Sequence, residues 1–197
     1  MKRLSWKYMA GLIDGEGCID APLFRDKRVK NEPLYIRPRI RVTLSECSFP
    51  VLDCIKTNHG GSILKRTTDN PHWNDSATWS LEGAKLRPFL QNIAKHLIIK
   101  KEQALLAIWI SDHLRRKGMQ FSEKPKQCAS QEMKAMKADP QRLSEAAIRK
   151  IISCDGYHYW SSRHDSCVVC GTTESKHEAR GMCKKCYDQL KNSGKLD

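Results

Sequence analysis

Hydrophobic and polar residues alternate along this chain with two different periods. Apolar residues recur with a helical period in some segments and alternate with polar residues, as in half-buried strands, in others. The expected helices cover residues 4–14, 49–57, 85–96, 101–116, 130–137 and 141–152, and the expected strands cover residues 18–24, 34–44, 62–68 and 76–81. Within about the first 118 residues this predicts an α+β fold of order αββαββα with an extra helix.

Local signals mark the ends of these elements. Ser5 is the expected N-cap of the first helix, and Gly15 and Gly17 are expected to end it. The basic segment 25–31 is expected to turn the first two strands into a hairpin. Residues 117–126 are polar and contain proline, which is typical of a linker. The expected domains are an α+β core, a helical extension or linker, and a four-cysteine module, at residues 1–118, 119–165 and 166–197.

The charge of the chain indicates a polyanionic partner. Its 197 residues include 35 Lys and Arg against 22 Asp and Glu, a formal net charge of +13. The longest apolar run, residues 104–110, is far shorter than the roughly 20 residues that span a bilayer. Lys7 interrupts the N-terminus too early for a secretion signal. We therefore expect no membrane partner and an intracellular, reducing compartment.

Gly11 is an unusual residue in the middle of the first expected helix, because glycine there costs about 1 kcal/mol relative to alanine. The close approach of a second backbone would offset this cost, since Ala10 and Gly11 leave one helix face without bulk. Glu16 would then fall just past the helix end, between two glycines that can adopt positive φ. If two copies of this helix pack together, their carboxylates meet and can hold a divalent cation.

Residues 9–17 read Met-Ala-Gly-Leu-Ile-Asp-Gly-Glu-Gly, and this segment resembles the LAGLIDADG motif of homing endonucleases at six of nine positions. The expected order αββαββα is similar to that family's core fold, over about residues 4–116. The sequence holds one such motif, which by this resemblance implies a homodimer. The resemblance places three motif residues at the dimer interface, with a packing and capping role for the last: Ala10, Gly11 and Asp14.

The same resemblance implies roles at a catalytic centre. Glu16, at the last acidic position of the motif, would bind a catalytic Mg²⁺ together with the backbone carbonyl of Gly15. A basic residue at the start of the last core helix would support the scissile phosphate, which implies Lys100, with Lys101 as the alternative. A polar residue after the second strand would hold the attacking water, and Ser45 is the candidate there.

Residues 25–41 are strongly basic, with seven basic residues against two acidic ones. Arg37, Arg39 and Arg41 alternate with apolar residues, so we expect a row of guanidinium groups on one strand face. A two-stranded ribbon of this kind can enter the major groove of DNA, although a solvated charged face is the alternative. The residues expected to contact DNA are Arg25, Lys27, Arg28, Lys30, Arg37, Arg39, Arg41, Lys65 and Arg66.

Four of the nine cysteines form two CxxC pairs near the C-terminus, separated by twelve residues. This spacing is typical of tetrahedral zinc sites, and the four expected ligands are Cys167, Cys170, Cys183 and Cys186. A module of about thirty residues has too little core to fold without such a staple, so the zinc is expected to be structural. Two disulfides are the alternative.

These observations together predict a homodimeric, Mg²⁺-dependent, site-specific endonuclease that acts on double-stranded DNA. By resemblance, it would cut a long, pseudo-palindromic target and leave short 3′ overhangs. Two alternatives use the same fold: a maturase that binds intron RNA, and a DNA-binding protein that does not cleave.

Overall fold

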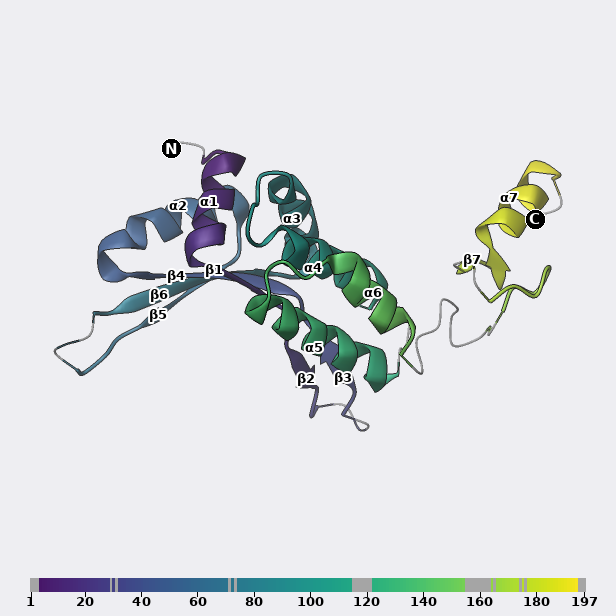
Figure 1. Cartoon of the computed structure of the whole chain (residues 1–197), viewed down its shortest axis with the longest axis horizontal. Helices are drawn as coiled ribbons and strands as arrows, with labels where there is room; N and C mark the ends of the chain where they lie inside the picture. The colour runs from purple at the N-terminus through teal and green to yellow at the C-terminus, as the bar shows by residue number, and fades with distance from the viewer. Residues whose placement is uncertain are drawn as a thin grey trace.

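The computed structural model describes residues 4–28, 30, 32–70, 72, 74–114, 122–154, 164, 166–173, 175 and 177–194 (Figure 1). The elements up to residue 114 are α1 (Trp6–Glu16), β1 (Gly17–Asp20), β2 (Leu23–Arg25), β3 (Leu34–Ile36), β4 (Arg39–Ser45), α2 (Phe49–His59), β5 (Ser62–Arg66), β6 (Ser76–Glu82), α3 (Leu86–Ala94) and α4 (Lys101–His113). The later elements are α5 (Glu123–Ala138), α6 (Ser144–Ile152), β7 (His177–Ala179), β8 (Met182–Cys183) and α7 (Lys184–Asn192).

Helix α1 begins where the sequence predicts and ends slightly later. Ser5 is its N-cap and accepts a hydrogen bond from the backbone N–H of Tyr8 at 3.1 Å. Glu16 is the last residue of the helix rather than the first residue beyond it. Gly17 is needed for close approach and not for positive φ, because its φ is −81° and a Cβ there would lie 2.7 Å from the carbonyl oxygen of Ile13.

The two long strands expected at 18–24 and 34–44 are each broken in two. Strand β1 pairs antiparallel with β4, and β2 pairs antiparallel with β3, so the hairpin divides between two sheets. The breaks fall at Pro22 and Pro38, because proline has no N–H to donate to a ladder. The carbonyl of Pro22 still accepts a hydrogen bond from the N–H of Arg37 at 3.0 Å, which holds the two halves of the hairpin together.

The main sheet has four antiparallel strands in the order β1-β4-β6-β5, and helices cover one of its faces. In Figure 1, α1, α2 and α3 lie on that side, while the other side of β4, β5 and β6 carries no helix of the described chain. Inward side chains of the strands, such as Val42 and Trp79, pack with Met9, Ile13 and Leu52 in one hydrophobic core. The indole N–H of Trp79 donates to the carbonyl of Gly60 at 2.8 Å, so its polar atom is satisfied inside this core.

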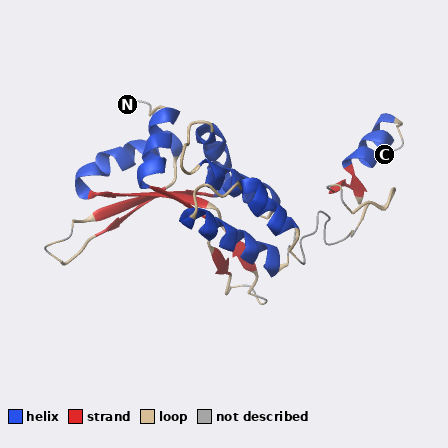
Figure 2. Cartoon of the chain, viewed as in Figure 1, coloured by secondary structure: helices blue, strands red, loops and turns tan. Residues whose placement is uncertain are grey.

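Helices α5 and α6 pack on the same core. They are among the blue helices of Figure 2, at the positions that Figure 1 labels. Buried residues of both helices, including Met133 and Ile151, belong to the core cluster that contains Trp79. Helix α5 begins at Glu123, so the linker expected at 117–126 is helical in its last part, and residues 115–121 lie outside the described chain. Pro125 fits the first turn, where no N–H is needed. No helix among the described residues is long and apolar enough to span a membrane.

Candidate functional site

The end of α1 and the start of α4 are joined by two reciprocal caps. The carboxylate of Asp14 accepts hydrogen bonds from the backbone N–H of Ile98 at 2.7 Å and of Lys100 at 2.9 Å. In return, the ammonium of Lys100 donates to the carbonyl oxygens of Ile13 at 2.8 Å and Asp14 at 2.7 Å. Each charge therefore satisfies free backbone groups at the terminus of the other helix. Asp14 therefore caps a helix of its own protomer.

Lys100 is partly withdrawn from solvent at this junction. Burial lowers its pKa, while the nearby Asp14, Cys18 and Glu16 act in the opposite direction, and the net shift is downward. An ammonium has three N–H donors, and the two caps use two of them. One donor is therefore left for a further acceptor. The alternative residue, Lys101, is the first residue of α4 and is exposed.

Glu16 is exposed beside this junction and makes no hydrogen bond or ion pair with any described residue. The pairing of β1 with β4 begins with Gly17, the residue after Glu16, opposite Val42. Ser45 lies two residues beyond Thr43, at the end of β4, and its hydroxyl contacts the thiol of Cys47 at 3.3 Å. Thr43, which the sequence reasoning missed, follows Val42 on β4 and offers a second exposed hydroxyl at this end of the β1–β4 pairing.

The three expected interface residues of α1 do not share one environment. Gly11 is exposed, and a Cβ there would meet nothing within 4 Å outside its own helix. Ala10, in contrast, is buried in the core of its own protomer, where it is 1% exposed. Only the Gly11 side of the helix is therefore open to a second chain.

Arg39 and Arg41 do share the open face of the sheet, but they are not free. Both guanidinium groups donate to the carboxylate of Asp20, Arg39 through Nε and Arg41 through Nη2, each at 2.7 Å. Asp20 lies opposite Arg39 in the β1–β4 pairing and diagonal to Arg41. Arg37 precedes β4, and its guanidinium stacks on the ring of Phe24, 3.7 Å from the ring centroid. Of the expected row of guanidinium groups, two are therefore ion-paired with Asp20 and the third stacks on Phe24.

The other expected basic contacts fall into two groups. Arg25 forms a two-bond pair with Glu123 of α5, at 2.6 Å and 2.7 Å, and Arg28 pairs with Asp26. Lys27, Lys30, Lys65 and Arg66 are exposed. Lys65 lies over the ring of Phe49, 5.3 Å from its centroid, whereas the register places Arg66 opposite Ser76. Trp73, an aromatic residue between β5 and β6 in the sequence, lies outside the described residues.

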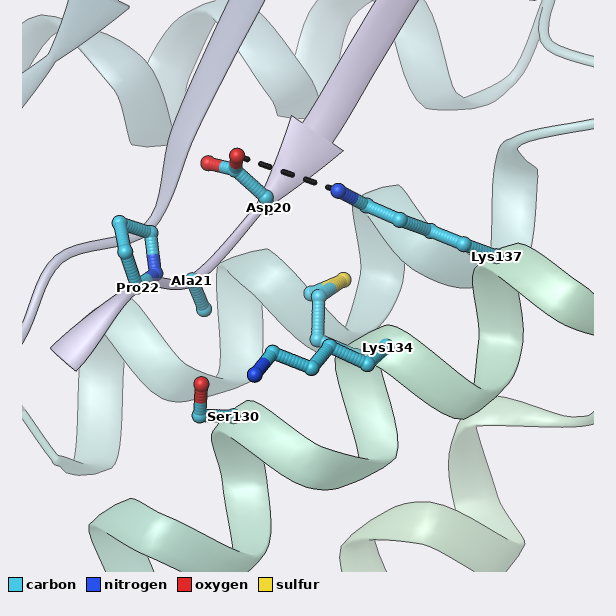
Figure 3. A pocket seen from close by; sticks show the side chains of 7 residues that line it. Asp20, Ala21, Pro22, Ser130, Lys134 and Lys137 are labelled. Carbon is cyan, nitrogen blue, oxygen red and sulfur yellow. Dashed lines mark ion pairs between the residues drawn. The ribbon is translucent and has the colours of Figure 1, made fainter.

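Two contributors to the open face were not expected from the sequence. Polar residues of β6, among them Thr78 and Ser80, lie opposite Thr43 and Arg41 in the register and extend a polar surface across the sheet. Lys137 of α5 also forms an ion pair with Asp20, with 3.8 Å between Nζ and Oδ2. Figure 3 shows this ion pair at a small cavity of about 90 Å³ lined by residues of β1 and α5. A long-range contact of this kind leaves no local signal in the sequence.

The four C-terminal cysteines come together as the spacing predicts. Their sulfur atoms all lie within 4.8 Å of one another, and those of Cys170 and Cys183 are 3.8 Å apart. Sulfurs placed about 2.3 Å from zinc at the corners of a tetrahedron are about 3.8 Å apart. The backbone N–H of Gly171 donates to the carbonyl of Cys167 at 2.8 Å, and Gly171 has a φ of +70°, as a tight knuckle turn requires.

The thiols of this group differ in acidity. Burial raises the pKa of Cys167, but backbone N–H groups, first that of Cys183, outweigh it and lower the pKa to about 6. A hydrogen bond with Cys170, together with burial, raises the pKa of Cys186 to about 12. The hydrophobic cluster of the module consists of Met182 and three of the cysteines, with Tyr187 and Leu190 against it. The module therefore has almost no apolar core apart from its sulfurs, and the donor set fits zinc.

Comparisons with known proteins agree with the fold of the first part of the chain. A family model described as LAGLIDADG endonuclease matches residues 9–108. The structure is similar to homing endonuclease I-CvuI, solved in complex with its target, with a TM-score of 0.55 and 19% identity over 74% of this chain and 91% of that one. It is also similar to homing endonuclease I-TnaI (TM-score 0.51, 18% identity, 76% of this chain and 97% of that one). It is similar as well to meganuclease I-SmaMI, solved bound to uncleavable DNA, with a TM-score of 0.52 and 20% identity over 79% of this chain and 50% of that one.

These similarities confirm the expected α+β core, because at such identities they show the fold. No curated protein matches the sequence.

Proposed function

The chain belongs to the LAGLIDADG endonuclease family, and we propose that it is a homodimeric, site-specific endonuclease acting on double-stranded DNA. Each protomer hydrolyses one phosphodiester, so the two strands of a long, pseudo-palindromic target are cut with short 3′ overhangs. The observation that supports this proposal best is the position of the Lys100 ammonium, which bonds the carbonyls of Ile13 and Asp14 just before the exposed Glu16 at the end of α1. A carboxylate and a preorganised cation in one place match the needs of phosphodiester hydrolysis.

Lys100 is held ready for a phosphate. Its two bonds to the carbonyls of Ile13 and Asp14 fix the ammonium, so no reorganisation is needed when a substrate arrives. The remaining N–H donates to a non-bridging oxygen of the scissile phosphate and stabilises the charge that develops there. This role requires the protonated lysine, although burial lowers its pKa.

Glu16 and the backbone carbonyl of Gly15 offer oxygen ligands, the type that Mg²⁺ takes. Among the described residues Glu16 has no competing partner, so its carboxylate is available to a cation. One protomer offers too few oxygens for a complete site, and we infer that the partner's copy of the motif and DNA phosphate oxygens supply the rest. When bound, Mg²⁺ supplies a Lewis acid at the scissile phosphate. Ser45, or Thr43 on the same face of β4, orients the attacking water.

The open side of α1 supports the homodimer. Tyr8, Gly11 and Gly15 share one helix face by their spacing, and a Cβ at either glycine would meet nothing within 4 Å outside the helix itself. Tyr8 is 46% exposed, and Ile98, just before α4, is 87% exposed. A second copy of α1 packed here would cover this apolar surface and offset the cost of Gly11 in mid-helix. It would also bring the two Glu16 carboxylates close together.

The sheet face without helices fits a duplex. In Figure 1 the β2–β3 hairpin points away from α1 and α2, whereas β5 and β6 run beneath α2, and exposed cations lie on both hairpins. Arg66 lies on one hairpin, and Lys27 and Lys30 lie at the turn of the other. Phosphate contacts by such residues position a duplex, while Arg39 and Arg41 lie where base edges would pass.

The C-terminal module supports a structural zinc site. The spacing, the distances between sulfurs and the lack of another core favour one four-thiolate site over two disulfides. Exposed cations on and beside α7, including Lys184 and Lys185, suit contact with phosphates outside the main site. Two other lysines of this region, Lys176 and Lys195, lie outside the described residues.

A Glu16→Gln variant tests the catalytic assignment. Genomic DNA is incubated with purified protein and Mg²⁺, and the new ends are located by sequencing. We expect staggered cuts from the wild type and a loss of at least about 100-fold in Glu16→Gln, because the amide does not replace an anionic ligand. Glu145→Gln, which removes an equal charge from the exposed side of α6, serves as the matched control and should cut normally.

Other outcomes separate the alternatives. Unchanged cleavage by Glu16→Gln would show that this carboxylate is not at the catalytic centre. A wild type that binds DNA tightly without cutting would indicate a non-cleaving DNA-binding protein. A wild type that binds structured intron RNA and no DNA would indicate a maturase.

A further inference from the structure

Asp20, the last residue of the edge strand β1, is an acidic residue on the surface that we assign to DNA. Its side chain is 14% exposed, while those of Arg39 and Arg41, which it bonds, are about one third exposed. A carboxylate repels phosphates, so its place on a nucleic-acid surface calls for a compensating role. The cluster still carries net positive charge, because Lys137 adds a third cation 3.8 Å from the same carboxylate.

The contacts of Asp20 leave each arginine with defined remaining donors. Arg39 bonds Asp20 through Nε at 2.7 Å and through Nη2 at 3.4 Å, so its guanidinium plane is fixed on one side. Arg41 uses Nη2 for Asp20, and its Nε is buried without a hydrogen-bond partner among the described residues. Both side chains therefore lose freedom of orientation before any DNA is present.

A guanidinium group can serve DNA in two ways. A free arginine on a flexible stem follows the nearest phosphate, which gives affinity without sequence discrimination. An arginine whose plane is fixed can direct two donors at the O6 and N7 acceptors of a guanine, which does discriminate. A carboxylate that already neutralises part of the charge favours the second use, because it competes with phosphates for the same donors.

We propose that Asp20 is a positioning residue that holds Arg39 and Arg41 for base reading and withholds them from phosphates. This inference rests on the proposed DNA-binding function. Lys137 supports Asp20 from α5, which lies beyond residues 9–108 that match the family model. The sequence preference of the protein would then depend on a residue that touches no base.

An Asp20→Asn variant tests this inference with a randomised duplex library as the probe. Bound duplexes are sequenced after selection, and affinity for the unselected library is measured over a range of salt concentrations. We expect Asp20→Asn to bind the unselected library more tightly and with a steeper salt dependence, by about 0.9 in the logarithmic slope for each new phosphate contact. We expect enrichment of preferred bases to fall by about tenfold at a few positions.

Two further variants make the result decisive. Asp53→Asn removes the same charge from an exposed position of α2, a helix on the covered face of the sheet. It should change the base preference and the salt slope less than Asp20→Asn does. Arg41→Lys keeps the charge and loses the planar group, so it should weaken the same base positions with an unchanged salt slope. It also keeps the inference testable if thermal unfolding shows that Asp20→Asn does not fold.

The possible failures can be told apart. If the wild type retains no duplex, the proposed DNA-binding function fails and this inference fails with it. If the wild type selects a sequence, and Asp20→Asn selects the same sequence with the salt slope of Asp53→Asn, only the role of Asp20 is overturned. An unchanged preference in Arg41→Lys would overturn it equally.

Discussion

Asp14 and Lys100 cap each other's helices: the Asp14 carboxylate accepts from the N–H groups that begin α4, and the Lys100 ammonium donates to the carbonyls that end α1. This reciprocal cap fixes where the catalytic candidates stand. The sequence motif that contains Asp14 and the lysine lie more than eighty residues apart, so the cap also closes a long loop of the chain.

Asp14→Ala removes one half of this cap. We expect the free energy of unfolding to fall by about 1–2 kcal/mol, the usual cost of losing a side-chain cap. Urea denaturation followed by circular dichroism measures this change. Asp53→Ala, at an exposed position of α2, is the matched control and should stay within about 0.5 kcal/mol of the wild type. Equal stability of the two variants would show that the cap contributes nothing.

Lys100→Met tests the other half of the cap. Single-turnover cleavage should fall by about 100-fold, as when a preorganised donor to a developing charge is removed, while duplex affinity changes little. Lys101→Met, one residue further along, removes an exposed lysine instead. A larger loss in Lys101→Met than in Lys100→Met would transfer the role to Lys101.

Substitution by alanine should have opposite effects on protomer stability at Gly17 and at Gly11. A Cβ at Gly17 would lie 2.7 Å from the Ile13 carbonyl oxygen, so Gly17→Ala should destabilise the protomer by about 1–3 kcal/mol. Gly11→Ala has open space within the protomer and should favour the helix by about 1 kcal/mol. Analytical ultracentrifugation should nevertheless show weaker dimerisation of Gly11→Ala. An unchanged dimer would place the interface elsewhere.

The contact that Glu132 of α5 makes with Lys150 of α6 is expected to weaken in acid. Glu132 is 2% exposed; burial alone would raise its pKa, but hydrogen bonds from Lys150 and Arg142 outweigh this effect, and the net pKa is lowered. A lowered folded-state pKa means that the stabilisation is present above the unfolded pKa of about 4.3 and is lost as pH falls through the folded value.

We therefore expect Glu132→Gln to be less stable than the wild type by about 1–2 kcal/mol near neutral pH, with a smaller difference in acid. Urea unfolding at several pH values measures this dependence. Glu145→Gln breaks only an exposed pair with Arg149 and should show no comparable dependence. A constant difference across the pH range would contradict the assignment.

Cys183→Ser tests the C-terminal module. We expect loss of bound zinc, unfolding of residues around β7, β8 and α7, and weaker duplex affinity, while the main core melts as in the wild type. Metal content by mass spectrometry and thermal unfolding measure these effects. Cys128→Ser, at a buried thiol of α5, should keep its zinc. Full zinc content in Cys183→Ser would argue against four thiolate ligands.

Local and short-range features of this molecule could be predicted from the sequence. The Ser5 cap, the αββαββα order and the clustering of Cys167 with Cys186 follow from spacing alone, because each depends on neighbours in the same element or on a standard ligand pattern. The roles of Glu16 and Lys100 were implied by resemblance, and the bonds of Lys100 to the carbonyls at the end of α1 could not be read from spacing.

Long-range pairings could not be predicted in the same way. Nothing near Asp20 indicates that it would bond Arg39 and Arg41, because the strand pairing brings them together across a hairpin. The pair between Arg25 and Glu123 joins residues 98 positions apart. Alternation suggested one long strand through Pro38, since the side chains keep their period while the backbone loses its ladder.

The break at Pro22 and Pro38 gives the β2–β3 hairpin a small sheet of its own, and this separation has an evolutionary consequence. Residues at its tip, such as Lys27 and Lys30, are exposed and lie outside the hydrophobic core, so they can be exchanged without disturbing it. Under the proposed function, exchanges in this appendage change the recognised sequence, while the buried framework that positions Asp14 and Lys100 is inherited intact.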